Sequence, residues 1–168
     1  MRNFEVTGST DYVDFDTTKN VFETDESKSH ISHVVADTES WEQKMASVIE
    51  EMPEVFSYVK NQNLGFTIPY VLEGDSRQYI PDFVAKVNTE DSSEYLNLII
   101  EVSGEKRKDK AAKVDTAKTL WVPAVNNHGG FGKWAFIEIS DPWDAKNLIR
   151  EFLKTHKTNE GVLEDANK

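Results

Sequence analysis

Two acidic residues lie inside strand-like apolar runs of this sequence. Asp82 is in YIPDFVAKV, residues 79–87, and Glu101 is in YLNLIIEVSGEK, residues 95–106. If the runs pair as an antiparallel hairpin that is symmetric about the polar loop between them, Asp82 falls opposite Glu101. Side chains opposed in this way lie about 5 Å apart at Cβ, where like charges are destabilising. A hard divalent cation such as Mg²⁺ would compensate, because it binds carboxylate oxygens and keeps several waters.

The same hairpin sorts its side chains into two faces, because successive residues of a strand point to opposite sides. The apolar face is expected to contain Phe83, Ala85, Val87, Leu96, Leu98, Ile100 and Val102. The opposite face holds Asp82, Val84, Ile99, Glu101 and Ser103. A second interpretation stays open beside the metal site: both acids are solvated at strand ends, or one is protonated or paired with a lysine.

Helices and strands alternate along the rest of the chain. A helix is expected from residue 37, capped by Asp37, Thr38 or Ser40, and its apolar stripe comprises Trp41, Met45, Val48, Ile49 and Met52. After Pro53 the pattern favours one or two further helical turns. The expected strands cover residues 66–74, 78–87, 96–103, 120–125 and 133–139, and further helices cover 106–119 and 141 to about 154. This order, α, three strands, α, strand, α, predicts an α/β fold.

Three regions follow from this pattern. Residues 1–36 are polar and acidic, and two short alternating pieces around TTKN predict a peripheral strand pair. Residues 37–154 form the main domain. The polar tail, residues 155–168, is expected to be disordered.

Composition narrows the class of protein. The chain has 168 residues, 38% of them hydrophobic, which fits one core. It has no cysteine and no apolar run near the ~20 residues of a membrane helix, so we expect a cytoplasmic protein without a membrane partner. The net charge of −11 argues against nucleic acid as a partner, but residues 106–133 carry 7 basic and 2 acidic side chains.

These residues resemble the PD-(D/E)xK nuclease superfamily in the Pro-Asp of YIPDF and the strand LNLIIEV that contains Glu101. Longer blocks, among them WEQKMA, LNLIIEVSG, DKAAKV, LWVPAVNNHGGFGKWAFIEI and DPWDAKNLI, resemble the C-terminal endonuclease domain of type III restriction enzyme Res subunits. The resemblance covers about residues 13–153. It implies a restriction-endonuclease-like core, a mixed four-stranded sheet flanked by helices in αβββαβ order.

The resemblance also implies an activity and its partners. The activity is Mg²⁺-dependent hydrolysis of DNA phosphodiester bonds, with Mn²⁺ able to substitute. The metal would be held by Asp82, Glu101 and the backbone carbonyl of Val102. The partners are DNA, a helicase or translocase ATPase region on the same or another chain, and a methyltransferase subunit.

One position departs from the family pattern, because Ser103 stands where the motif lysine belongs. A displaced lysine could take its role, and helical spacing turns Lys110 and Arg107 toward the sheet while Lys108 points away. The alternative is a catalytically silent nuclease-like module that binds DNA or a helicase partner.

Two further sets of residues are candidates. Glu42 lies on the flank of the first helix's apolar stripe, from which it could reach the metal through water, or it is merely solvated. The DNA-binding candidates in the basic stretch are Lys106, Arg107, Lys108 and Lys113. That stretch could equally be a solvated face.

Overall fold

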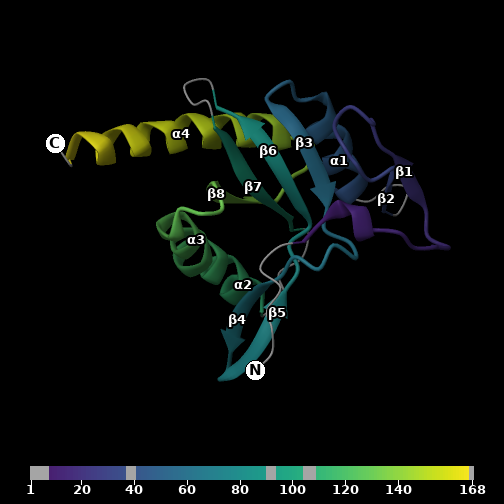
Figure 1. Cartoon of the computed structure of the whole chain (residues 1–168), viewed down its shortest axis with the longest axis horizontal. Helices are drawn as coiled ribbons and strands as arrows, with labels where there is room; N and C mark the ends of the chain where they lie inside the picture. The colour runs from purple at the N-terminus through teal and green to yellow at the C-terminus, as the bar shows by residue number, and fades with distance from the viewer. Residues whose placement is uncertain (1–7, 37–40, 90–93, 104–108, 167–168) are drawn as a thin grey trace.

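A computed structural model describes residues 8–36, 41–89, 94–103 and 109–166, with side chains as far as His156. Its centre is a four-stranded sheet in the order β3 (Val55–Lys60), β6 (Phe83–Asn88), β7 (Tyr95–Val102) and β8 (Lys133–Ile139) (Figure 1). The first three strands are antiparallel, and β8 runs parallel to β7. The predicted α/β class is therefore confirmed, with a mixed sheet.

The β6–β7 hairpin has the register that the sequence predicts. Its partners include Phe83 and Ile100, Ala85 and Leu98, and Val87 and Leu96. These six residues are at most 3% exposed, so burial of this face fixes the register.

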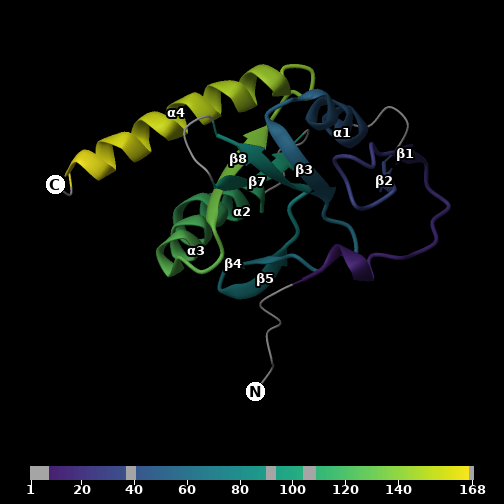
Figure 2. The same ribbon diagram turned by 45° about the horizontal axis from the view of Figure 1, so that its top comes forward.

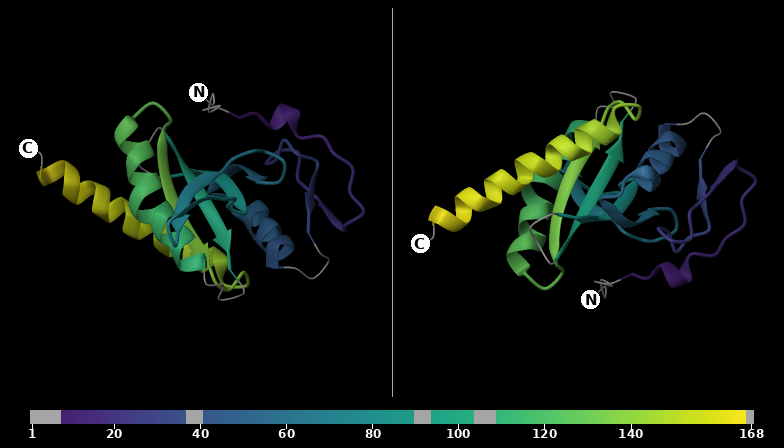
Figure 3. Two further views of the ribbon diagram at one scale, coloured as in Figure 1. Left: turned by 90° about the horizontal axis from the view of Figure 1, so that it is seen from below. Right: turned by 90° about the horizontal axis from the view of Figure 1, so that it is seen from above.

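Helices cover both faces of the sheet (Figures 2 and 3). On one face, α1 (Trp41–Glu51) and α4 (Ala145–Ala166) pack on the apolar side of the β6–β7 hairpin. On the other face lie α2 (Lys110–Thr116), the short π-helical segment η2 (Ala117–Trp121) and α3 (Val122–His128). A second apolar cluster fills that side, made of Ile68, Tyr70, Tyr79, Ile99, Ala117 and Phe136.

A separate hairpin joins β3 to β6. Its strands, β4 (Ile68–Leu72) and β5 (Asp75–Tyr79), meet at a tight turn in which Glu73 and Gly74 have φ of 52° and 87°. The sequence predicts strands at 66–74 and 78–87, but the second is divided: β5 ends before Pro81 and β6 begins after Asp82. The division places Tyr79 and Asp82 at adjoining strand ends.

Two segments differ from their predicted structure. Residues 55–60, expected to continue a helix, form β3, because their β-branched and aromatic side chains pair with β6 and bury Val55 and Tyr58. Residues 120–125, expected as a strand, are helical. Pro123 has no N–H for a strand ladder but is tolerated in the first turn of α3.

The chain termini also differ from the expectation. The peripheral strand pair is β1 (Val21–Glu23) with β2 (His33–Val35), after a short 3₁₀ helix η1 (Thr10–Tyr12), and it does not turn at TTKN. Helix α4 begins at Ala145 and continues to Ala166, through the segment expected to be disordered, because no proline interrupts it. The capping residues Asp37, Thr38 and Ser40 lie outside the described residues. Within the described part, no helix is both long and apolar enough to cross a membrane.

Candidate metal site

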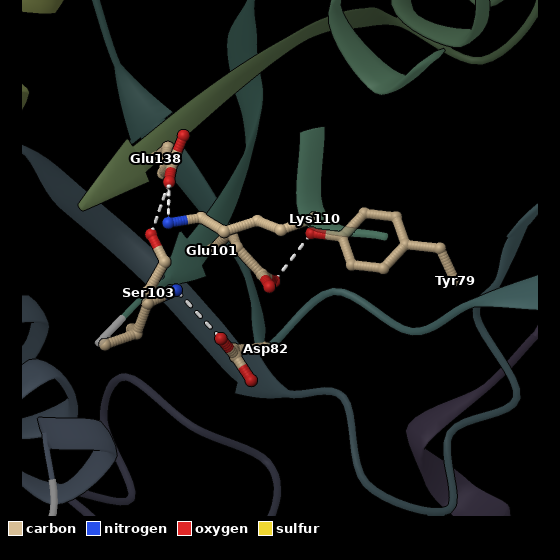
Figure 4. Close-up of polar contacts among 7 residues, drawn as sticks. Tyr79, Asp82, Glu101, Ser103, Lys110 and Glu138 are labelled. Carbon is tan, nitrogen blue, oxygen red and sulfur yellow. Dashed lines mark hydrogen bonds and ion pairs between the residues drawn. The ribbon is translucent and has the colours of Figure 1, made fainter. Parts of the chain in front are cut away.

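The two predicted acids meet where β6 begins and β7 ends (Figure 4). Asp82 directly precedes Phe83, which pairs with Ile100, so the next pair in register is Asp82 with Glu101. Both side chains are half-buried. The cross-strand neighbours inferred from the sequence are therefore brought together.

Each carboxylate has a hydrogen-bond donor. The Val102 N–H donates to Asp82 Oδ2 at 2.8 Å, and the Tyr79 hydroxyl donates to Glu101 Oε2 at 2.6 Å. Tyr79 is 2% exposed, and burial together with the charge of Glu101 raises the pKa of its hydroxyl, which stays protonated as a donor. Tyr79 was not predicted as a site residue, since it belongs to a separate hairpin.

The pair is electrostatically unfavourable without a cation. Burial raises the pKa of Glu101 to about 7, and the charge of Asp82 adds to the shift. Burial also raises the pKa of Asp82, against the hydrogen bond from Val102 and the charge of Lys60. Two opposed acids that cannot both ionise at low cost are typical of functional sites.

The chemistry of these groups fits a hard divalent cation. In an extended strand the N–H and C=O of one residue point to the same edge, so the Val102 carbonyl faces the edge on which its N–H bonds Asp82. Among the described residues, no three His, Asp or Glu side chains gather closely enough to hold a metal. A cation here would take two carboxylates, a carbonyl and waters, which suits Mg²⁺.

A second polar cluster adjoins Glu101 on the α2 side of the sheet. Glu138 pairs with Glu101 in the β7–β8 register, and its Oε1 accepts from Lys110 Nζ at 2.6 Å and from Ser103 Oγ at 2.5 Å (Figure 4). Burial opposes ionisation of Glu138, but these two hydrogen bonds lower its pKa overall. Lys110 thus faces the sheet, as its helical spacing predicts, and it forms an ion pair with Glu138.

An ion pair adjoins Asp82 from the α1 side. Lys60 Nζ, at the end of β3, lies 2.6 Å from Glu42 Oε2 on α1. The charge of Lys60 lowers the pKa of Asp82, whereas that of Glu42 raises it. Glu42 is near the acids, as expected, but its structural contact is with a lysine that the sequence analysis did not select.

The DNA-binding candidates are only partly described. Lys113 pairs with Asp109 at 2.8 Å and lies over the rings of Tyr70 and Tyr79, 5.8 and 5.9 Å from their centroids. Lys106, Arg107 and Lys108 lie outside the described residues. Lys113 is therefore placed against the β4–β5 hairpin that contributes Tyr79.

Comparisons with known proteins do not identify a family for this chain. No family model, no curated protein and no solved structure matches the chain.

If the acid pair binds Mn²⁺, replacing Tyr79 with Phe should shift the pH of half-binding. The Tyr79 hydrogen bond lowers the pKa of Glu101, so its loss raises that pKa and moves the half-binding pH upward. Mn²⁺ titration followed by electron paramagnetic resonance between pH 5 and 8 measures this midpoint. The control is Tyr70→Phe, a buried tyrosine on β4. An unchanged midpoint in Tyr79→Phe would contradict the assigned role.

Proposed function

We propose that this chain is a Mg²⁺-dependent endonuclease domain that hydrolyses DNA phosphodiester bonds, as part of a type III restriction-like system. The observation that carries the proposal is the facing pair Asp82 and Glu101, two half-buried carboxylates with raised pKa values on adjoining strands. The order α1, β3, β6, β7, α2–α3, β8 supports it, since a mixed sheet in αβββαβ order is what the motif resemblance implies.

The chain's residues divide the work in this proposal. Asp82, Glu101 and the Val102 carbonyl hold the metal, and the Val102 N–H and Tyr79 hydroxyl orient the two carboxylates. The bound ion would activate a water and stabilise the charge that develops on the phosphate. Hydrolysis adds that water's oxygen to phosphorus and breaks the bond to one deoxyribose oxygen.

DNA and protein partners complete the proposal. Because the net charge is −11, contacts to DNA phosphates would depend on a local group of basic side chains. The basic stretch 106–133 follows Glu101 and could provide them. A helicase or translocase ATPase region, on the same or another chain, and a methyltransferase subunit would supply movement and DNA specificity.

The second candidate is a catalytically silent module that binds DNA or a helicase. Ser103 favours it, because this residue replaces the motif lysine and its hydroxyl bonds Glu138. A silent module would bind DNA in a salt-dependent way without cleaving it.

Nicking of supercoiled plasmid tests the proposal. With Mg²⁺ or Mn²⁺ and a high protein concentration, wild-type protein should convert supercoiled to open-circular DNA, and EDTA should stop the conversion. DNA binding without nicking would favour the second candidate, and metal-independent nicking would contradict both.

A further inference from the structure

We propose that Lys60 supplies the positive charge that contacts the scissile phosphate, taking the role that the family pattern gives to a lysine at position 103. This inference rests on the proposed nuclease function. It assigns a catalytic residue to β3, a strand that comes from the opposite end of the sheet to β8.

The backbone fixes Lys60 beside the acid pair. Strands β3 and β6 are antiparallel with Lys60 opposite Phe83, and the Asn61 N–H donates to the Asp82 carbonyl at 2.8 Å. Asn61 is therefore the residue opposite Asp82, and Lys60 directly precedes it. Its Nζ lies 5.2 Å from the Phe83 ring centroid, and its side chain is 12% exposed.

Lys60, Lys110 and Lys113 are each ion-paired, and they differ in which acid near the site their charge affects. Lys110 bonds Glu138 at 2.6 Å on the α2 side, and Lys113 bonds Asp109, the residue that precedes α2. By contrast, the charge of Lys60 acts on Asp82 itself. A cation that already acts on one metal-binding carboxylate is well placed for a phosphate that bridges to the same metal.

The ion pair of Lys60 borders a cavity, and the Lys60 side chain itself is 12% exposed. Glu42, whose side chain is 38% exposed, holds Nζ at 2.6 Å, and both residues line a polar cavity of about 360 Å³ together with Lys19, Asn61 and Gln62. Glu42 is thus a positioning residue for Lys60. Neither acid of the pair lines this cavity, but Asn61 does, and its N–H donates to the Asp82 carbonyl, so the cavity lies beside the start of β6.

The test compares nicking rates in Mn²⁺ for a set of matched variants. Lys60→Gln should lose about 100-fold or more, the size of effect seen when one charge-stabilising donor is removed. Lys110→Gln should lose less than about 10-fold, and Lys86→Gln, an exposed lysine on β6, should match wild type. Adding Ser103→Lys to Lys60→Gln should restore at least about 10-fold, because the new lysine stands at the family position.

A merely structural role for Lys60 would give a different pattern. Lys60→Gln should lose most of the nicking and keep Mn²⁺ binding, whereas Lys60→Arg, which keeps the positive charge, should retain a clearly larger share of the wild-type rate. Equal losses in both variants, or full activity in Lys60→Gln, would overturn the inference and leave the nuclease proposal standing. Absence of metal-dependent nicking in wild type would instead overturn the nuclease proposal, and this inference with it.

Discussion

Glu101→Gln is expected to reduce metal-dependent nicking by at least about 1,000-fold, the scale of loss for a group on which the reaction depends. The amide keeps the size of the glutamate, and its oxygen still accepts from the Tyr79 hydroxyl. It lacks the negative charge that a hard cation needs, so the site should fold and yet fail to hold the metal. The rate of open-circle formation at saturating Mn²⁺ measures the effect, and Asp82→Asn should behave in the same way.

The control for this comparison is Glu51→Gln, an exposed glutamate on α1. It carries the same change of charge away from the acid pair, so it should nick like wild type. Nicking by Glu101→Gln at the wild-type rate would show that the activity does not depend on this carboxylate.

The free energy of unfolding should fall by about 2 kcal/mol as the pH rises from about 4.5 to 7 in the absence of metal. The unfolded glutamate titrates near its ordinary pKa of 4.5, whereas burial beside Asp82 raises the folded pKa of Glu101 to about 7. The folded state therefore binds more protons in this window, so it is favoured at low pH and loses that advantage as the pH rises. Urea unfolding at a series of pH values measures the change.

Two additions sharpen this experiment. Glu101→Gln should flatten the pH dependence and be more stable than wild type at pH 8, because the amide has no charge to bury. If Mn²⁺ binds the ionised folded pair, as proposed, it should stabilise wild type at pH 7.5 and much less at pH 5. Stability of wild type that rises between pH 4.5 and 7 without metal would contradict the raised pKa of Glu101.

The β6–β7 hairpin was predictable because every second residue of its two runs is apolar and the runs enclose a short polar loop. Alternation and a buried face leave one register, which the structure shows at Phe83 and Ile100. Residues 55–60 misled the prediction because a short apolar run after a helix fits either period, and pairing with β6 decides it. The segment 120–125 has strand-like composition, but Pro123 fits a helix start.

The acid pair was predictable from that hairpin, and the placement of Glu42 and Lys110 followed from helical spacing. Asp82 and Glu101 follow from the register alone. Tyr79, Lys60 and Glu138 come from other strands, and no local pattern states which strand lies beside which. Glu138 could have been placed beside Glu101 only from the parallel pairing of β7 with β8. The sequence does not specify that pairing.

Direct titration of Mn²⁺ into the metal-free chain tests most directly whether Asp82 and Glu101 form a metal site. At pH 7.5, calorimetry or electron paramagnetic resonance should find a Mn²⁺ site in wild type that Mg²⁺ displaces, and Asp82→Asn and Glu101→Gln should each lose it. Equal Mn²⁺ binding by wild type and both variants, or none by any of them, would contradict the account.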